Sequence, residues 1–383
     1  MKQVFSFLFC ISFCCIGCSK DDVNPDFEVP ELTSLNSISF TVNTANERNL
    51  FIYAGGEYVA IDWGDGTENK YQIPHNEQCM HRYRASGTYN VKIWSEHLTF
   101  LNLSSLMQDI TNLEVDNCPV LESLMLDGFS DIEHFKLEGC PRLTHLNLGN
   151  WENLTSLNIS KCTALKQFYC YTHPKLTSLD LSAHKKLENL TLAFVGLEEL
   201  DLTHNTELID LSIQAVKITT LDVEKNKRLA YIYCYQTDLE ELKIAENHLS
   251  VLMVANNKLK TLDLSLYPDL YELRCDGNEL TSIDLTPCPY IHAFSGMHNQ
   301  LTELKIPEKS RLEQVYISSN AFGAEALNAI FTALPNAQVK YPNSRALPPP
   351  RYSSIQYNFN PGAEGCKKEI ITKKGWRITV EKQ

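Results

Sequence analysis

A single phrase recurs through the middle of this sequence and restricts the folds open to it. The phrase is an apolar residue, two free positions, a second apolar residue, one free position and a third apolar residue. Self-similarity at a short fixed period is typical of repeat architectures, in which each unit buries its apolar side against its neighbours. The sequence therefore predicts a solenoid with positions 1, 4 and 6 of each phrase in its core. Successive phrases begin at Leu176, Leu187, Leu197, Leu208, Ile218, Leu229, Leu239, Leu249 and Leu259.

The phrase extends well beyond this central stretch, from a weak start at Leu98 through Ile110 to Leu312, and two phrases make one coil of 20 to 22 residues. Positions 4 and 6 point the same way in an extended chain, so each phrase predicts one strand. Position 9 must turn, and an Asn there can bond the backbone of its own turn and of the next coil, which predicts a ladder. The Asn residues at this position are Asn205, Asn226, Asn257, Asn278, Asn299 and Asn320.

The phrase with its terminal Asn, L-x-x-L-x-L-x-x-N, resembles the leucine-rich repeats of bacterial internalin-type proteins. The resemblance covers residues 98–320 and implies a leucine-rich-repeat solenoid. Since the sequence lacks the long inserts that would form a convex helix, we expect a mainly β fold with flat coils and little helix. Cysteines occupy position 6 at Cys170, Cys234 and Cys275, and position 9 at Cys118, Cys140, Cys162 and Cys288. Because free cysteine behaves as a small buried apolar residue, we expect these to fill the core and to hold no metal.

The chain begins with a segment typical of secretory signals. Lys2 precedes a short apolar run that is too short to span a bilayer. Residues 1–17 resemble a bacterial lipoprotein signal peptide, in which a cysteine that follows a small residue is lipidated, although Cys15 stands where Leu is usual. The resemblance implies a lipid anchor at Cys18, which follows Gly17.

The residues after Cys18 are polar and acidic and include two prolines, so residues 18–32 predict a tether. The acidic run at residues 19–22 is similar to the export tag that places some lipoproteins on the outer face of the outer membrane. We therefore expect a lipid-anchored protein that faces the cell exterior. A cleaved signal and a soluble periplasmic protein are the alternative.

Residues 33–97 alternate apolar and polar positions with the period of strands and predict a small β-sandwich. Part of this region resembles the polycystic-kidney-disease (PKD) repeat, which implies a spacer or presentation module. The residues that carry the resemblance are Trp63, Gly64, Asp65, Gly66, Tyr83, Gly87, Tyr89 and Val91. Asp62 and Asp65 are candidate calcium ligands, but two carboxylates fall short of the six to eight oxygens that calcium takes. A structural interpretation is stronger, because the carboxylate of an Asp-Gly turn accepts hydrogen bonds from the backbone of that turn.

After the repeats, residues 324–335 have a helical pattern that Pro335 closes. The tail contains Asn360-Pro361-Gly362, a cysteine, a short helical stretch, Lys374-Gly375-Trp376 and a final strand pattern. This order resembles the C-terminal caps of other bacterial surface proteins. Residues 321–383 therefore predict an α/β cap over the last coil.

Charge and motifs exclude several classes of function. The net charge of −13 comes without a basic patch, which argues against nucleic acid as a partner. The sequence has no G-x-S-x-G, H-E-x-x-H, P-loop or G-x-G-x-x-G motif, so neither a catalytic site nor a cofactor is expected. Carboxylates recur at position 5 of alternate phrases, and this recurrence indicates one solvated face rather than a glycosidase pair. They are Asp180, Asp201, Asp222, Asp263 and Asp284.

The two faces of the predicted solenoid differ in their outward residues. One face carries Tyr169 and Tyr171 on one coil and Tyr231, Tyr233 and Tyr235 three coils further on. Tyr is common in strands, but clustered exposed aromatics mark binding surfaces, and the other face has none. Coils stack at about 4.8 Å, so the two tyrosine groups should stand about 14 Å apart as walls of a shallow trough. Its polar floor comprises Asn189, Thr191, Ala193, Asp210, Ser212 and Gln214.

These features predict a non-catalytic binding or adhesion lipoprotein of the cell surface. We expect the tyrosine-rich face to recognise an extracellular glycan or protein, and sugars suit stacking on Tyr with hydrogen bonds to Asn, Asp and Gln. A structural or self-associating envelope protein is the second hypothesis, and the oligomeric state stays open. An extracellular hydrolase ranks third because the site chemistry is missing.

Overall fold

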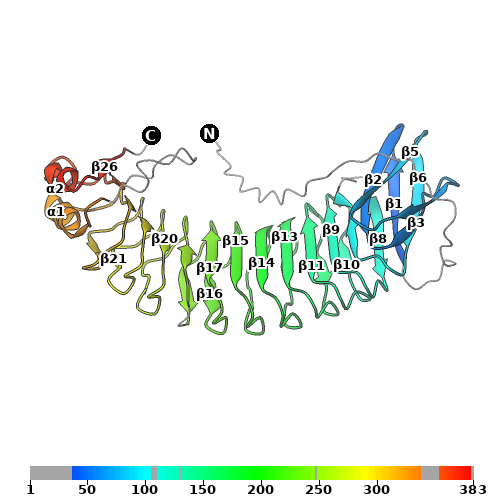
Figure 1. Cartoon of the computed structure of the whole chain (residues 1–383), viewed down its shortest axis with the longest axis horizontal. Coiled ribbons are helices and arrows are strands. Elements are labelled where there is room, and N and C mark those ends of the chain that lie inside the picture. Colours follow the sequence, from blue (N-terminus) through cyan, green and yellow to red (C-terminus); the bar gives the residue numbers. More distant parts are fainter. Residues whose placement is uncertain (1–36, 105–109, 130, 246–247, 338–352, 381–383) are drawn as a thin grey trace.

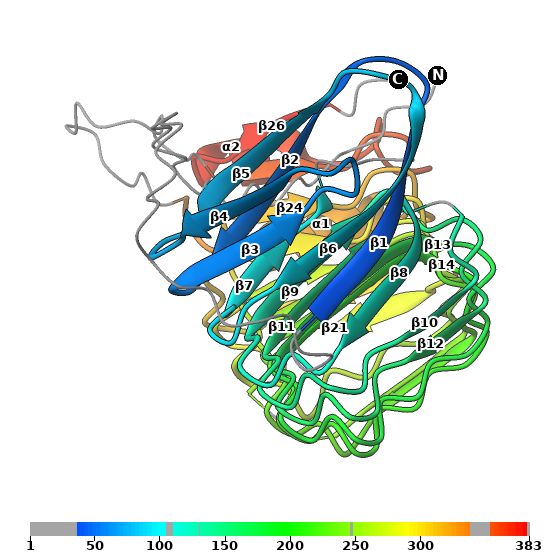
Figure 2. The same cartoon turned by 90° about the vertical axis from the view of Figure 1, so that its right-hand side faces the viewer.

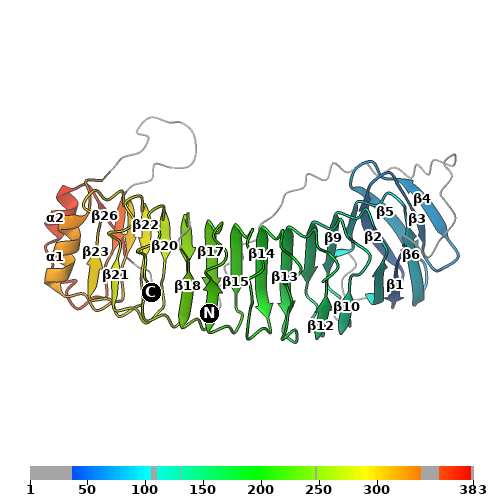
Figure 3. The same ribbon diagram turned by 90° about the horizontal axis from the view of Figure 1, so that it is seen from below.

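The chain forms an elongated, gently curved solenoid with a β unit at one end and two short helices at the other (Figure 1). This computed structural model describes residues 37–104, 110–129, 131–245, 248–337 and 353–380. Viewed along the axis the coils lie behind one another (Figure 2), and from below the strands stand side by side along the length (Figure 3). The predicted mainly β solenoid with little helix is confirmed. The predicted signal peptide, Cys18 and the tether lie outside the described residues.

The N-terminal β unit contains six strands. They are β1 (Ser37–Thr44), β2 (Arg48–Gly55), β3 (Tyr58–Asp62), β4 (Glu68–Gln72), β5 (Glu77–Tyr83) and β6 (Gly87–Trp94). One side of the solenoid carries the strands of a long sheet, hereafter the long face. These are β7 (Phe100–Asn102), β9 (Ser123–Asp127), β11 (His145–Gly149), β13 (Gln167–His173), β14 (Asn189–Val195), β15 (Asp210–Gln214), β17 (Tyr231–Tyr235), β19 (Val251–Met253), β20 (Glu272–Arg274), β22 (Ala293–Ser295), β24 (Gln314–Tyr316), β25 (Ser354–Gln356) and β26 (Arg377–Ile378).

The opposite side, hereafter the short face, has fewer strands. They are β8 (Ile110–Asp116), β10 (His134–Lys136), β12 (Ser156–Asn158), β16 (Thr220–Val223), β18 (Glu241–Ile244), β21 (Ser282–Asp284) and β23 (Glu303–Lys305). The helices are α1 (Ala324–Ala333) and α2 (Lys368–Lys373).

The long face is one sheet of 15 strands in the order β26-β25-β24-β22-β20-β19-β17-β15-β14-β13-β11-β9-β7-β2-β5. From β7 onward its strands are parallel and in register, as in the line of Leu190, Leu211 and Ile232. These three side chains are at most 1% exposed. Because side chains alternate along a strand, the neighbouring positions 3, 5 and 7 of every phrase point outward on this face.

The short face is interrupted, so the prediction of one strand per phrase is wrong there. The phrases that begin at Leu176 and Leu197 contain no strand. In both, the Asp at position 5 accepts a hydrogen bond from the backbone N–H two residues later, Ser182 N to Asp180 at 2.9 Å and Thr203 N to Asp201 at 2.8 Å. The same contact forms at Asp222 and Asp284, which lie in strands, so it does not by itself account for the missing strands.

Two ladders of buried side chains join the coils, one along each edge. On the long face Asn257, Asn278, Asn299 and Asn320 each donate to a backbone carbonyl of the preceding coil. Asn205 and Asn226 do the same after the short face. The predicted Asn ladder is therefore confirmed. Other residue types continue the second ladder toward the N-terminus, since Cys162 Sγ donates to Leu137 O at 3.9 Å and His184 Nε2 lies 3.1 Å from Ile159 O.

The nine described cysteines form no disulfide and are buried, which agrees with the core role predicted for the seven of them that lie in the repeats. Both faces also continue into the N-terminal unit. In one sheet the order is β4-β3-β6-β1-β8, and in the long sheet β2 joins β7 to β5. The two sheets thus run across residues 97 and 98, where the sequence indicates a boundary.

The turn of the PKD-like motif is held by its carboxylates, as its structural interpretation predicts. Asp62 accepts a hydrogen bond from Gly64 N at 2.9 Å, and Asp65 accepts one from Thr67 N at 3.1 Å. Gly64 and Gly66 have φ angles of 76° and 89°, which favour glycine. The assignment of residues 33–97 to that class of domain stays a prediction.

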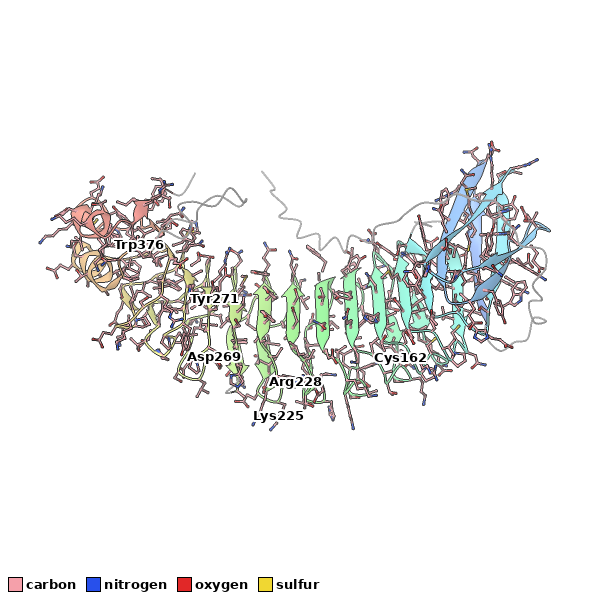
Figure 4. The ribbon with its side chains drawn as sticks, in the orientation of Figure 1. Cys162, Lys225, Arg228, Asp269, Tyr271 and Trp376 are labelled. Carbon is pink, nitrogen blue, oxygen red and sulfur yellow. The ribbon has the colours of Figure 1, made fainter. Side chains whose placement is uncertain are left out.

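The repeat architecture continues past Asn320, where the sequence predicts the end of the repeats. Strand β25 pairs parallel with β24, and Asn360 repeats the ladder by donating to Ile317 O at 2.9 Å. Helix α1 lies in the stretch predicted to be helical and packs against β23 and α2. Trp376 lies beside these helices (Figure 4) and its indole N–H donates to Pro335 O at 2.8 Å. The predicted cap role of this region stays a prediction.

Candidate functional site: the tyrosine face

The ten residues predicted to bind a ligand share one surface of the long face. They lie on β13, β14, β15 and β17, which are consecutive neighbours in the sheet. The residues that alternate with them along each strand are buried in the core, so packing fixes the ten side chains on the outer surface. We call this surface the Tyr face. It comprises Tyr169, Tyr171, Asn189, Thr191, Asp210, Ser212, Gln214, Tyr231, Tyr233 and Tyr235, with Ala193 and Gln167 in the same rows.

The parallel register sets the spacing of the two tyrosine groups. Tyr169 is the partner of Thr191, Thr191 of Ser212 and Ser212 of Tyr233. Three parallel steps of about 4.8 Å put the two tyrosine backbones about 14 Å apart. Small and hydrogen-bonding side chains occupy the two strands between them, as the sequence indicated.

The side chain of Tyr171 is held against neighbouring coils and is not a free wall of the predicted trough. Its hydroxyl donates to Asp127 Oδ2 at 3.0 Å, two coils toward the N-terminus, and its ring passes over Gly149. A Cβ atom at Gly149 would lie 2.2 Å from the ring. Asn150 also donates to Asp127, at 2.6 Å. Burial and the nearby Asp127 carboxylate raise the pKa of Tyr171, so this hydroxyl is committed to the protein.

The remaining tyrosines differ in how far their hydroxyls are engaged. Tyr235 donates to Met253 Sδ at 2.7 Å, and Tyr169 lies 3.3 Å from Gln167 Oε1. No hydrogen bond to the hydroxyl of Tyr231 or Tyr233 is found within the described parts of the chain. Tyr231 is also the most open of the five, at 39% exposed. These two hydroxyls are therefore available to a ligand.

Asp210 lies on β15 between the two tyrosine groups and is half-buried. Its burial raises the pKa of its carboxyl group above the ordinary value. The pKa values of Tyr169 and Tyr233 are raised by burial and then by the Asp210 charge. The carboxylate therefore acts on a tyrosine from each group.

Sequence reasoning missed a further set of exposed aromatic residues at the turns that precede the long face. Tyr271 and Tyr290 are 45% and 46% exposed. Tyr271 stacks on His292 with ring centroids 4.2 Å apart, and the Arg311 guanidinium lies 4.8 Å from the centre of the Tyr290 ring. Figure 4 shows Tyr271 and Asp269 in the C-terminal half of the solenoid, and β20, which follows Tyr271, is two strands from β17 of the Tyr face. These residues fall at position 2 or before position 1 of their phrases, where no recurring residue type signals them.

The row of position-5 carboxylates has a structural role that the sequence did not reveal. Besides Asp180 and Asp201, three others accept a backbone N–H two residues later at 2.9 to 3.1 Å, namely Asp222, Asp263 and Asp284. Lys305, which occupies the same row one coil further on, also lies 3.8 Å from Asp284. These acids hold the turns of the short face.

The described residues also bear on two other kinds of site. They contain no group of three or more His, Cys, Asp or Glu side chains placed to hold a metal ion. None of the helices in the described ranges has the length and apolar character needed to cross a membrane.

Two bacterial proteins are among the solved structures that match this chain. An internalin of Listeria monocytogenes strain 4b F2365 is 16% identical, with 74% of this chain and 87% of the internalin chain covered and a TM-score of 0.50. A leucine-rich-repeat protein of Leptospira interrogans is 17% identical, with 69% and 91% covered and a TM-score of 0.33. No protein-family model matches the sequence, and no curated protein matches it significantly. The internalin likeness agrees with a leucine-rich-repeat solenoid and bears on the fold alone.

Proposed function

We propose that this chain is a non-catalytic binding or adhesion lipoprotein of the cell surface, and that its Tyr face recognises an extracellular protein or glycan. The observation that carries the proposal is the grouping of five tyrosines around a polar floor on one rigid sheet. Tyrosine offers a large contact area at a low cost in conformational entropy, and its hydroxyl adds a hydrogen bond. Strands held in register by a buried core keep this surface organised before binding, which lowers the cost of association.

Loss of one tyrosine from each group tests this proposal. Tyr169→Ala combined with Tyr233→Ala should reduce affinity more than about tenfold, since each aromatic contact contributes about 1 kcal/mol or more. Both side chains are only partly buried on the outer surface, so the melting temperature should change little. The mature ectodomain would be screened on glycan arrays and extracellular protein panels, and wild type and variant compared on each hit.

Tyr271→Ala combined with Tyr290→Ala is the matched control, because it removes two exposed tyrosines that are not among the ten residues of the Tyr face. A hit that the control loses and the Tyr-face variant keeps would move the site to the turns near the C-terminal end. Equal affinity of both variants and wild type would contradict a tyrosine-dependent site.

The anchor belongs to the same proposal, with Cys18 as the acylated residue and an outer-membrane location facing the cell exterior. The PKD-like unit would then act as a spacer, and the C-terminal region as a cap. Cys18→Ser should abolish acylation and release the protein from the membrane fraction. Metabolic labelling with a fatty acid would check this, and a variant that is still labelled would contradict the lipid anchor.

Self-association through the Tyr face is the second candidate function. An exposed, rigid aromatic surface can pair with its own copy as well as with a ligand. Sedimentation of the mature ectodomain distinguishes the two, because a stable dimer that the Tyr169→Ala and Tyr233→Ala changes dissociate would bury the face.

A further inference from the structure

Asp210 is the one charged side chain among the outward positions of the four strands that make the Tyr face. The other outward residues of β13, β14, β15 and β17 are tyrosines, amides, hydroxyls, one alanine and the exposed Phe194. Tyr231 is the direct cross-strand partner of Asp210, and Tyr233 is its diagonal neighbour. The carboxylate therefore stands against the second tyrosine group, within electrostatic range of the first.

This carboxylate has no hydrogen-bond or ion-pair partner among the residues that the structure describes. Cations do occur at the nearby edge of the sheet, but they are committed to other acids. Lys166 pairs with Glu188 at 2.9 Å, and Arg228 pairs with Glu207. Figure 4 shows Arg228 in the turn at the lower edge of the solenoid, beside Lys225.

An unpaired, half-buried carboxylate is unfavourable for folding, because burial removes part of its hydration without supplying a partner. The position-5 aspartates of the short face show the opposite arrangement, since each of them accepts a backbone hydrogen bond. A charge that lacks such a structural role, and that lies among aromatic rings, is placed to meet a charge from outside.

We propose that Asp210, Tyr231 and Tyr233 form a subsite for the cationic side chain of a basic polypeptide partner, an inference that rests on the proposed function of the Tyr face. The faces of tyrosine rings attract ammonium and guanidinium groups, and the carboxylate supplies the opposite charge. Lysine and arginine carry their charge at the end of a long flexible stem that can reach a half-buried group. An amino sugar carries its ammonium directly on a bulky ring and reaches such a group less easily.

The partner segment should run across the strands between the two tyrosine groups. About 14 Å corresponds to about four extended residues, so one short segment can place its cation at Asp210 and contact Tyr169 as well. The expected partner is an extended basic segment of a protein.

The test uses the mature ectodomain and a capped pentapeptide with one central lysine, followed by NMR of the tyrosine rings. The matched peptides carry norleucine or acetyl-lysine in place of lysine, and a glucosamine tetramer provides the sugar arm. Wild type should bind the lysine peptide and neither neutral peptide, with shifts in the Tyr231 and Tyr233 signals. Asp210→Asn should weaken this binding about tenfold or more, as expected for loss of a charge-assisted contact.

Glu240→Gln is the control variant, because it removes the same charge from an exposed residue outside the Tyr face. It should bind the lysine peptide like wild type, which excludes a general effect of net charge. The melting temperature of Asp210→Asn should equal or exceed that of wild type, since an unfavourable buried charge is removed. If Asp210 had a structural role, Asp210→Asn would instead have a lower melting temperature than wild type.

Several outcomes overturn the inference. They are absence of lysine-peptide binding at millimolar concentration, equal binding of the neutral peptides, unchanged binding by Asp210→Asn, and preference for the glucosamine tetramer. The proposed function is tested separately on the hits from the arrays and panels. A hit that needs Tyr169 and Tyr233 but not Asp210 would keep the Tyr face as a binding site and remove only its cation subsite.

Discussion

Leu211→Asp should destabilise the protein by about 4 kcal/mol or more, enough to unfold the central coils. Leu211 is fully buried in β15, between Leu190 of β14 and Ile232 of β17. The substitution removes an apolar side chain from the core and puts a charge where no partner can reach it. Chemical denaturation followed by circular dichroism would measure the change in free energy of unfolding. Since solenoids can unfold in segments, hydrogen exchange of the backbone amides in β14, β15 and β17 should be measured alongside the denaturation.

Thr177→Asp is the matched control, because it introduces the same charge at an exposed position of another phrase. Its effect should stay within about 0.5 kcal/mol. If Leu211→Asp were as stable as Thr177→Asp, the assignment of position 4 to the core would be wrong.

The repeat could be read from the sequence because its three apolar positions are the residues that coils bury between them. Leu190, Leu211 and Ile232 illustrate this, since each fills position 4 and each is buried in line with the others. The ladder was also predictable, because Asn at a recurring turn has few other uses. Where His184 takes the place of Asn, its ring makes the equivalent contact to Ile159 O, and the residue type alone gave no sign of it.

The last coil on the long face escaped the sequence because its spacing is broken. The segment of residues 338–352 separates β25 from the preceding phrases, and Ile355 and Tyr357 stand where leucine is usual. Both are nonetheless buried, at 0% and 4% exposed, and Asn360 completes the ladder. A period search follows distance along the chain, whereas a coil requires only the right apolar shape beside the previous one.

The location of the Tyr face was predictable from strand alternation, but its internal arrangement was not. Alternation places Tyr169, Tyr171 and Asp210 outward without saying where their side chains lean. The hydrogen bond of Tyr171 to Asp127 depends on the missing side chain at Gly149, a relation between coils that no single phrase contains. Likewise, the isolation of Asp210 depends on pairs such as Lys166 with Glu188, which form across neighbouring coils.

The second large effect is expected at Asn257, where Asn257→Ala should cost about 4 kcal/mol or more in free energy of unfolding. The side-chain oxygen of Asn257 accepts hydrogen bonds from Thr237 N, Thr237 Oγ1 and Leu239 N at 2.8 to 3.2 Å. Its amide nitrogen donates to Cys234 O at 2.8 Å and Val254 O at 3.1 Å. One truncation therefore leaves several buried groups short of a partner, and each such group costs about 1–3 kcal/mol.

Asn153→Ala is the control for that substitution, because the Asn153 side chain is partly exposed and accepts a hydrogen bond from the exposed Lys175, at 2.6 Å. Its effect should stay within about 0.5 kcal/mol, as is usual for surface changes. Hydrogen exchange separates the expected mechanism from a general loss of stability. The amides of Thr237 and Leu239 should lose protection in Asn257→Ala before those of β9 and β11, which lie far along the sheet. Unchanged protection at these two amides would mean that the ladder does not hold the turn, and that leucine packing alone joins neighbouring coils.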